Sequence, residues 1–576
     1  MVVLKGLARD KIRVDIPEGF VRQAEKPPLR KAYLDVRGAV EKTIYENVSL
    51  NNAVILHDSV VAMIPDNDRE GVHYSSVSWT TASGPPPKPK GRTLIDPSHP
   101  VGVAHPLNSD WTRENIVAKM GEIVLPTVVM LARAICRMAE KLGGWNRIRL
   151  WKLDLKGAFT LIDFDPASVR LLALGLTGGR TYFPLAGIFG LSIMPFIFNV
   201  ASKVLSKAIN LKIFGEVFIY VDDLMGITDV AHLESDMHTA ISFSQQMFGD
   251  DAVEFRKMES GQKFVFIGWE FDASAEAKSF SLSDKNLSRA IYGFFDVNID
   301  RGVAFNIMET LASLASRYAL VCPWMRPYTG HLYATLKGQN DRAILHLLPA
   351  AQACILRWRA FFCLLILNPK KYRRPIADLE TAPSDFLIEY DSSLTGLGVR
   401  IFQLGGMGRR EETLVIVAGL DTPFQLKGDS SFQNTMEFMA VVLGLGLLAK
   451  EGVHNARFRL RGDSRTSLAW AKKHRYKPGP SEATASAFLL FNQVCGLCMG
   501  EEDNEFILGL INVECDGLSR GKTPAQLGYD PSIIRSILPG DTLYQLVCLC
   551  DPLTRLTDEM AISKLHHQME GLLLRL

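Results

Sequence analysis

The sequence predicts a mixed α/β fold, of the α+β kind, divided among several domains. Its 576 residues are 47% hydrophobic, which is enough to supply more than one core. Short apolar runs bounded by turn residues, such as 217–219 and 264–267, predict strands. Longer segments with apolar residues at helical spacing, such as 193–204 and 438–449, predict helices. The chain therefore combines both kinds of element.

Two adjacent acids lie between two of the apolar runs. Residues 217–219 precede Asp222 and Asp223, and residues 224–227 follow them, which predicts a β-hairpin with both carboxylates at its tip. Adjacent like charges repel unless water or a cation neutralises them. A divalent cation that handles phosphates is one explanation for the pair. A solvated turn is the other, and it accounts for most isolated Asp-Asp pairs.

A further acid, Asp154, occurs upstream, again next to a predicted strand. It ends a segment, 148–153, in which polar and apolar residues alternate as in a strand of the same sheet. Between this strand and the hairpin, Pro195 suits the first turn of a helix. The apolar face of that helix is expected at Ile193, Ile197, Val200 and Val204.

These segments, in this order, resemble the palm of reverse transcriptases. The matching blocks are LDLKGAF at 153–159, FGLSIMPFIFN at 189–199, YVDD at 220–223 and FIGWEFD at 266–272. One such block is weak, but four in order at workable spacing make a strong signal. The resemblance implies a right-hand polymerase of fingers, palm and thumb/connection.

The resemblance also implies a two-metal site. Asp154 and Asp222 would bridge two Mg²⁺ ions (Mn²⁺ is possible), with Asp223 beside them and the Leu155 carbonyl as a backbone ligand. One ion would make the primer 3′-hydroxyl a better nucleophile. The other would neutralise charge on the triphosphate and the leaving pyrophosphate.

Further positions match substrate contacts of the family. Phe159 matches the aromatic residue that blocks a ribose 2′-hydroxyl, so deoxynucleotides are expected; a core aromatic is the alternative. Phe189 and Gly190 match the segment that packs on the nucleotide. Lys257 matches, at imperfect spacing, a lysine near the pyrophosphate.

A stiff, basic segment at 84–91 leads into a predicted strand, 92–96. Lys90 and Arg92 best match the finger residues that hold the triphosphate, and Lys88 is the competing lysine. A guanidinium fork with a flexible ammonium suits such a group. The alternative is a basic surface linker.

A second set of acids occurs toward the C-terminus. Asp391 ends a predicted strand, 386–391, and Glu437 stands near the start of a helix expected from Asn434, which is apolar almost all round. Asp463 follows an alternating strand, 456–461, and Asp516 lies in the segment NVECDGLSR.

The order strand-Asp, helix-Glu, strand-Asp and late Asp resembles ribonuclease H. The resemblance implies two further Mg²⁺ ions and hydrolysis of the RNA strand of an RNA–DNA hybrid. Each acid also has a structural reading as a cap partner, a turn residue or a first-turn helix acid, but four in order behind a polymerase palm favour catalysis. Ribonucleases H commonly carry a histidine shortly before this last segment. Here 506–511 reads FILGLI, so slower turnover is expected.

Charge and cysteine content constrain the setting. The net charge of +2 is low for a polymerase, but basic residues cluster at 88–92, 370–374 and 472–477.

Nine cysteines without regular spacing suggest reduced thiols in an intracellular protein, in the cytoplasm or nucleus. The N-terminus has no signal-peptide shape. Cys495 and Cys498 could form a zinc cluster with Cys548 and Cys550, but buried helix cysteines are favoured.

No membrane association is expected, because no uncharged apolar run reaches 18 residues. The nearest candidate, 351–367, contains Arg357 and Arg359 and is interpreted as a packed helix.

Five parts are expected along the chain. They are an unassigned extension at 1–80, fingers and palm at 81–280, a helical thumb or connection at 281–380, a ribonuclease H-like domain at 381–525 and an unassigned tail at 526–576. The chain looks most like the DIRS-like group of retrotransposons. This resemblance is based on the helical part at 281–380, the FGLS block at 189–192 and the segment NVECDGLSR at 512–520.

The resemblance thus implies an RNA-directed DNA polymerase that copies retroelement RNA and degrades the RNA of the hybrid. Its partners would be an RNA template, a DNA primer, the RNA–DNA hybrid and deoxynucleoside triphosphates, in an oligomeric state that is left open. Alternatives are a catalytically weak or inactive RNA-binding scaffold, although all seven acids are present, and a DNA-templated polymerase on the same palm.

Overall fold

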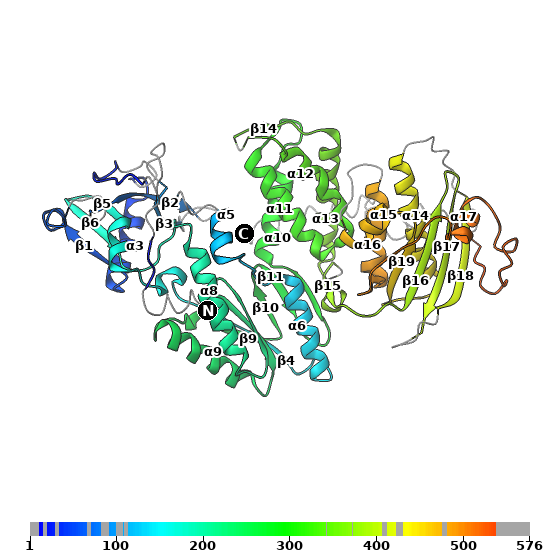
Figure 1. Ribbon diagram of the computed structural model, residues 1–576, viewed down its shortest axis with the longest axis horizontal. Helices are drawn as coiled ribbons and strands as arrows, with labels where there is room; N and C mark the ends of the chain where they lie inside the picture. The colour runs from blue at the N-terminus through cyan, green and yellow to red at the C-terminus, as the bar shows by residue number, and fades with distance from the viewer. Residues whose placement is uncertain are drawn as a thin grey trace. The chain divides into compact units, whose positions relative to one another are not determined.

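The structure is a computed structural model (Figure 1). It describes residues 11–14, 20–28, 34–65, 71–81, 91–98, 107–108, 113–340, 342–370, 372–405, 412–421, 430–474 and 481–536. The predictions for Lys88, Lys90, Cys548 and Cys550, and for the side chain of Arg92, lie outside the described residues. Two compact units are present, Met1–Ile267 and Gly268–Leu576. The finer five-part division of the chain stays a prediction.

The first unit contains two sheets. One has the strand order β1-β6-β5-β2-β3 and the other has the order β7-β8-β4-β9. The first sheet consists of β1 (Ala53–His57), β6 (Arg180–Pro184), β5 (Ala173–Leu176), β2 (Tyr74–Thr81) and β3 (Gly91–Asp96). The second consists of β7 (Glu216–Tyr220), β8 (Asp223–Asp229), β4 (Ile148–Asp154) and β9 (Glu259–Gly261), all antiparallel.

Helices surround these sheets. They are α3 (Arg37–Ser49), α4 (Asp58–Val61), α5 (Arg113–Met120), α6 (Val128–Lys141), α7 (Pro166–Val169), α8 (Met194–Asn210) and α9 (Leu233–Phe248). Short 3₁₀ turns are η1 (Ala158–Leu161), η2 (Arg170–Leu172) and η3 (Phe255–Lys257), and β10 (Lys263–Phe266) ends the unit. Helices α6, α8 and α9 each contact the second sheet.

The strand pairing of β4 with β8 depends on one glycine. Trp151 in β4 is fully buried and lies opposite Gly226 in β8. A Cβ atom at Gly226 would lie 1.8 Å from Cε2 of Trp151, so the indole ring can cover β8 only because this position has no side chain. The tight packing fixes the register that brings the ends of both strands together.

Helix α8 confirms the predicted helix with Pro195 in its first turn, and of the predicted apolar face Ile193 and Ile197 are buried. Val200 and Val204 are only half-buried, whereas Phe198, Ala201 and Leu205 are buried. The buried residues lie one position further along because α8 packs this side against the hairpin strand β7.

The second unit begins with helices packed on aromatic side chains. Its elements here are β11 (Trp269–Asp272), β12 (Ser279–Leu282), α10 (Asp284–Asp296), β13 (Val303–Ala304), α11 (Phe305–Val321), η4 (Pro323–Thr329), α12 (Gly330–Leu336), β14 (Ile344–Leu345), α13 (Pro349–Leu367), β15 (Arg374–Pro375) and η5 (Ile376–Leu379). In the core, the rings of Trp358, Phe361 and Phe362 lie 5.6 to 5.8 Å apart and are fully buried.

Helix α13 is the one helix in the described part of the chain that is long and apolar enough to cross a membrane. Half of its most apolar window is buried inside the protein. Arg359 on this helix donates hydrogen bonds to the carbonyls of Phe294 and Val297, which supports the prediction of a packed helix.

The rest of the second unit is a sheet with helices on both faces (Figure 1). The strand order is β18-β17-β16-β19-β20, with β21 also on β19. The strands are β16 (Phe386–Ser392), β17 (Gly396–Leu404), β18 (Glu412–Asp421), β19 (Arg457–Gly462), β20 (Cys498–Met499) and β21 (Glu505–Phe506), and β19 runs parallel to β16. The helices are α14 (Ser430–Lys450), α15 (Arg465–Lys473), α16 (Ser481–Cys495) and α17 (Val513–Ser519).

Adjacent residues of β17 show how the two faces are covered. A Cβ atom at Gly398 would lie 2.2 Å from the Cys515 carbonyl oxygen in α17, whereas Val399 lies next to Gly444 of α14. Helix α14 begins at Ser430 and not at Asn434, so Glu437 lies two turns inside it. The reading of Glu437 as the partner of an Asn434 cap is therefore wrong.

Two other expectations concern basic residues and cysteines. Within the cluster 370–374, Arg373 binds Glu270 at 2.7 Å and Arg374 donates to the Leu320 carbonyl at 2.8 Å, so both arginines hold the unit together instead of forming an open basic stripe. Cys495 and Cys498 are both buried, but only Cys495 lies in a helix, as the favoured interpretation predicts, whereas Cys498 belongs to strand β20.

Candidate active sites

The first acid site is built by the hairpin of β7 and β8 beside β4. Asp154 lies directly opposite Asp223 across the β4–β8 pair, and Asp222 occupies the two-residue turn between β7 and β8. The amide of Leu155 donates to the Asp222 carbonyl oxygen at 2.9 Å, which ties the turn to the end of β4. The three acids predicted for one site are therefore neighbours.

The hairpin turn adopts an unusual backbone conformation. Val221 has φ of 59°, in the left-handed region, which a β-branched residue rarely adopts and which costs on the order of 1–3 kcal/mol. Ser202 of α8 offers a hydroxyl 3.0 Å from the Val221 carbonyl oxygen and so helps to hold the turn. Sequence reasoning missed Ser202, because nothing local to α8 indicates a partner 19 residues away.

The electrostatics of this site favour a bound cation. Burial, together with the nearby Asp154 and Asp222, raises the pKa of Asp223 to about 7. Lys257 Nζ lies 2.6 Å from Asp154 Oδ2, and this hydrogen bond raises the pKa of Lys257. The site thus draws in positive charge, and carboxylate oxygens suit a hard divalent ion.

The nucleotide-contact residues predicted from the resemblance also gather in the first unit. Phe159 is buried, with its ring centroid 5.0 Å from that of Phe189 and 6.0 Å from that of Phe198. Gly190 follows, and a Cβ atom there would lie 1.8 Å from the Ile95 carbonyl oxygen. Since Ile95 lies in β3, this close approach joins the strand that contains Arg92 to the Phe189–Gly190 turn.

Asn108 fixes the same turn, and the sequence offered no signal for it. Its amide nitrogen donates to the Gly190 carbonyl oxygen at 3.0 Å, and its oxygen accepts from the Ser192 amide at 3.1 Å. The side chain thereby replaces the hydrogen bonds that a regular element would supply.

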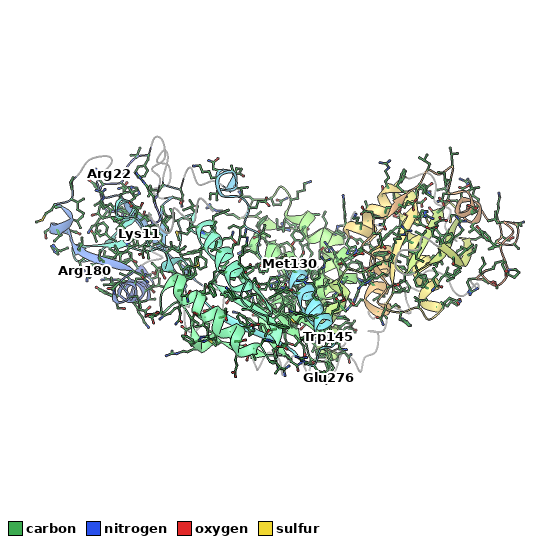
Figure 2. The ribbon with its side chains drawn as sticks, turned by 60° about the horizontal axis from the view of Figure 1, so that its bottom comes forward. Lys11, Arg22, Met130, Trp145, Arg180 and Glu276 are labelled. Atoms are coloured by element: carbon green, nitrogen blue, oxygen red, sulfur yellow. The ribbon has the colours of Figure 1, made fainter. Side chains whose placement is uncertain are left out.

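A cavity of about 820 Å³ lies beside the segment that follows β4. Its lining includes Gly157, Thr160 and Lys11. Of these three residues, Figure 2 labels Lys11. Lys11 Nζ is 3.4 Å from Asp163, and Thr160 donates to the Gly157 carbonyl oxygen at 3.0 Å. The turn that contains Phe159 is therefore bordered by open space.

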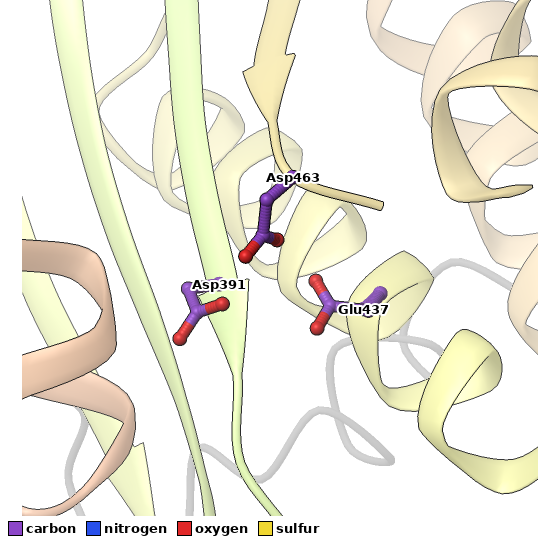
Figure 3. A group of neighbouring side chains, drawn as sticks. All are labelled: Asp391, Glu437 and Asp463. Carbon is purple, nitrogen blue, oxygen red and sulfur yellow. The ribbon is translucent and has the colours of Figure 1, made fainter. Parts of the chain in front are cut away.

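The second acid site lies in the second unit, at the end of its parallel strand pair (Figure 3). Asp391 comes from β16, Asp463 directly follows β19, and Glu437 comes from α14. Each offers an oxygen within 4.8 Å of the others, and this is the one such group among the described residues. Parallel neighbours end at the same edge of the sheet, which explains why two acids 72 positions apart meet.

Glu437 is the residue whose surroundings best fit a bound cation. Its Oε1 accepts from the Gln433 amide at 3.2 Å, whereas its Oε2 is buried without a hydrogen-bond partner. A buried, unpartnered carboxylate oxygen is costly unless a cation meets it. Asp391, Glu437 and Asp463 therefore form a group that could hold a metal ion.

Mutual repulsion and burial perturb these acids. Burial, followed by the charges of Asp391 and Asp463, raises the pKa of Glu437 to about 8. Burial, with the charge of Asp463, raises the pKa of Asp391 to about 6, and burial also raises that of Asp463. Such shifts mark a site built to bind positive charge or a proton.

Asp516 lies at the edge of this group. It raises the pKa of Asp391 and of Asp463 through its charge, so it is nearby, but it does not belong to the three-residue group. Its Oδ1 accepts from Arg520 Nε at 2.7 Å. Ser519, which sequence reasoning missed, donates to Asp391 Oδ2 at 3.0 Å.

The raised pKa of Glu437 predicts that metal-free protein loses stability as the pH rises. An unfolded glutamate releases its proton near 4.5, whereas folded Glu437 holds it to about 8. Between these values the folded state binds more protons, so the free energy of unfolding falls as the pH rises through the window. Mg²⁺ binds the deprotonated acids, so we expect it to raise Tm more at about pH 8.5 than at about pH 6.

Thermal unfolding in Mg²⁺ and in EDTA at both pH values measures this effect. Glu437→Gln has no proton to release at this position and should lose the part of the pH dependence of the Mg²⁺ shift that Glu437 contributes, while the parts from Asp391 and Asp223, whose pKa values are also raised, remain. An equal Mg²⁺ shift at both pH values in the parent protein would contradict the assignment of Glu437 as a ligand.

Comparisons with known proteins give structural neighbours only. No protein-family model matches the sequence, and no curated protein matches it. Among solved structures, a foamy viral protease-reverse transcriptase in complex with RNA/DNA hybrid is similar at 11% identity and a TM-score of 0.43, covering 86% of this chain and 57% of that one. The same viral protein in complex with dsDNA has 10% identity and a TM-score of 0.40, covering 88% of this chain and 93% of that one.

A third structure, the foamy viral protease-reverse transcriptase dRH in complex with ds DNA, has 11% identity and a TM-score of 0.40, covering 84% of this chain and 71% of that one. Because all three likenesses are this distant, we base the functional proposal on the residues of this chain.

Proposed function

We propose that this chain is an RNA-directed DNA polymerase that also cleaves the RNA strand of RNA–DNA hybrids. The observation that carries the proposal is the presence of two acid sites in separate units, each assembled from residues distant in sequence. Asp154 meets Asp222 and Asp223 in the first unit, and Asp391 meets Glu437 and Asp463 in the second. Helix capping or turn formation explains single acids, but it does not explain two such groups.

In the polymerase site, each residue has a distinct role. Asp154 and Asp222, with Asp223 and the Leu155 carbonyl, would hold two Mg²⁺ ions, which when bound would supply activation of the primer 3′-hydroxyl and charge neutralisation on the triphosphate. Lys257 pairs with Asp154 at 2.6 Å and is assigned to the pyrophosphate. Its raised pKa keeps it protonated for that contact.

Arg92, with Lys90, is assigned to the triphosphate. Support comes from β3, because its Ile95 amide donates to the Phe189 carbonyl oxygen at 3.0 Å, which joins this strand to the turn next to Phe159. Phe189 and Gly190 are assigned to pack on the nucleotide. The Phe159 ring, whose centroid lies 5.0 Å from that of Phe189, is assigned to block the ribose 2′-hydroxyl.

In the nuclease site, Asp391, Glu437, Asp463 and Asp516 would hold the second pair of Mg²⁺ ions, which when bound would supply an activated water. Gln433 and Ser519 orient Glu437 and Asp391 through their hydrogen bonds. Hybrid selection relies on groove shape and 2′-hydroxyl groups.

The proposed setting is a retroelement of the DIRS-like group, in the cytoplasm or nucleus, with an RNA template, a DNA primer and deoxynucleoside triphosphates as partners. Primer extension on poly(rA)/oligo(dT) with Mg²⁺, run beside cleavage of a hybrid, tests the proposal. An RNA-binding scaffold would bind both substrates and change neither. A DNA-templated polymerase would extend on poly(dA) and not on poly(rA).

Phe159→Val tests sugar selection. Removing the ring opens space over the ribose 2′ carbon, so we expect the ratio of ribonucleotide to deoxynucleotide incorporation to rise at least about tenfold. The ring also packs against Phe189 and Phe198, so the variant should lose on the order of 2 kcal/mol of stability. Incorporation assays with both nucleotide types decide the role: lower stability with an unchanged ratio would make Phe159 a core residue only.

A further inference from the structure

An arginine lies against an exposed aromatic ring at the rim of the nuclease acids. Arg465 is the first residue of α15, and its guanidinium carbon lies 4.3 Å from the ring centroid of Phe506. Phe506 is 39% exposed, and Arg465 is exposed as well. Among the described residues, Arg465 has no acidic partner within salt-bridge distance. Its charge is therefore held in place by the ring and is available to an anion.

Backbone pairing places this arginine and ring beside Asp463. Phe506 in β21 lies opposite Gly462 in β19, and the Ile507 amide donates to the Gly462 carbonyl oxygen at 3.0 Å. Asp463 directly follows Gly462, and Arg465 comes two residues later. The chain after Phe506 also returns to the site, because a Cβ atom at Gly509 would lie 3.0 Å from Asp463 Oδ2.

The position of Arg465 does not stabilise its own helix. A cation in the first turn of a helix opposes the helix dipole, whereas the last turn of α15 contains Lys472 and Lys473, where cations are favourable. Nor does Arg465 pair with Asp516, whose partner is Arg520 at 2.7 Å. A role in binding an external anion explains both the location and the missing partner.

We propose that Arg465, oriented by Phe506, binds a phosphate of the RNA strand next to the one that is cleaved. This inference rests on the proposed ribonuclease function. A planar guanidinium can bind two phosphate oxygens at once, and stacking on the ring reduces the side-chain freedom lost on binding. The acid group repels a polyanion until cations bind, so a fixed positive charge at its rim aids substrate docking. Phe506, which orients Arg465, is the first residue of the FILGLI segment, and this segment lacks the histidine that ribonucleases H commonly carry.

Phe506 is a positioning residue in this scheme, because it acts through Arg465. Replacing it by leucine should reproduce the loss seen with Arg465→Ala. Replacing it by tyrosine keeps the aromatic face and should preserve cleavage within about twofold of the parent. A purely structural role for Phe506 would lower Tm without this selective rescue.

The decisive experiment uses the full chain and hybrids with one neutral methylphosphonate linkage, placed in turn at each RNA position near the cleavage site. In the parent, one neutral linkage adjacent to the cleaved bond should lower kcat/KM for cleavage about tenfold, because KM rises while kcat stays the same. Arg465→Ala should show this loss on the all-phosphate hybrid and no further loss on the neutral one. Its kcat/KM should also depend less steeply on salt, by about one phosphate contact.

Lys450→Ala is the matched control, because it removes one exposed positive charge from the end of α14 that lies away from Glu437. It should leave kcat/KM, the salt dependence and the methylphosphonate pattern unchanged. Binding of the same hybrids in EDTA, measured by anisotropy, gives a readout without turnover and should show the same loss of sensitivity at that linkage in Arg465→Ala.

The outcomes separate this inference from the function on which it rests. If Asp463→Asn cleaves hybrids like the parent, the ribonuclease assignment fails. If Asp463→Asn is inactive but Arg465→Ala remains as sensitive to the neutral linkage as the parent, only the Arg465 inference fails.

Discussion

Asp222→Asn is expected to abolish DNA synthesis while hybrid cleavage continues. Asparagine keeps the size of the side chain but removes the charge that, with Asp154 and Asp223, would hold the cations. A loss of about 4 kcal/mol of transition-state stabilisation corresponds to a roughly thousandfold slower extension. Single-nucleotide incorporation with Mg²⁺, under single-turnover conditions, measures this directly.

Glu234→Gln provides a matched control, since it removes an exposed carboxylate from α9 in the same unit. It should extend primers at the parental rate. Thermal unfolding should show that Asp222→Asn is folded. If this variant extends primers at the parental rate, the hairpin acids are a solvated turn and the polymerase assignment is lost.

The second large effect is expected at Asp463. Asp463→Asn should eliminate cleavage of the RNA strand, while primer extension stays at the parental rate, because no acid is shared between the two sites. Its carboxylate lies within 4.8 Å of ligand oxygens from Asp391 and Glu437, so losing its charge should cost at least about a hundredfold in cleavage. Gel analysis of end-labelled RNA in a preformed hybrid measures the rate.

Asp503→Asn is the control for this site, because Asp503 is 83% exposed and pairs with Lys472 outside the acid group. It should cleave normally. Parental cleavage by Asp463→Asn would mean that the acids are structural and that this part of the chain only tethers a nucleic acid. The double variant with Asp222→Asn should lose both activities, as expected for independent sites.

Local patterns in the sequence predicted the elements that hold the acids of the two candidate sites. The alternation at 148–153 is a period-two signal of a strand, the apolar runs on either side of Asp222 and Asp223 predict two more strands, and the structure has all three, as β4, β7 and β8. Pro195 likewise marks the first turn of α8. Part of the face of α8 was misjudged, because apolar residues surround most of that helix and β7 decides which of them are covered.

The start of α14 shows a similar limit. Asn434 is a good cap residue, but the helix begins one turn earlier, at Ser430, and Gln433 reaches the Glu437 carboxylate. Cap preferences compete with tertiary contacts that the local sequence does not contain.

Within the sites, the acids were predictable and their supporting residues were not. Carboxylates that end strands in a recognisable order give a chemical signal. Ser202, Asn108 and Ser519 give none, because a polar side chain becomes a positioning group only when the fold brings its partner near. Lys257 was predicted near the pyrophosphate, and the structure adds its contact with Asp154.

One measurement tests the central claim that this chain contains two separate metal-dependent sites. A single reaction contains a hybrid with a labelled DNA primer and a differently labelled RNA template, Mg²⁺ and deoxynucleotides. The parent should lengthen the DNA and shorten the RNA, Asp222→Asn should only shorten the RNA, and Asp463→Asn should only lengthen the DNA. A parent that binds this hybrid but leaves both strands unchanged would contradict the account and identify a nucleic-acid-binding scaffold.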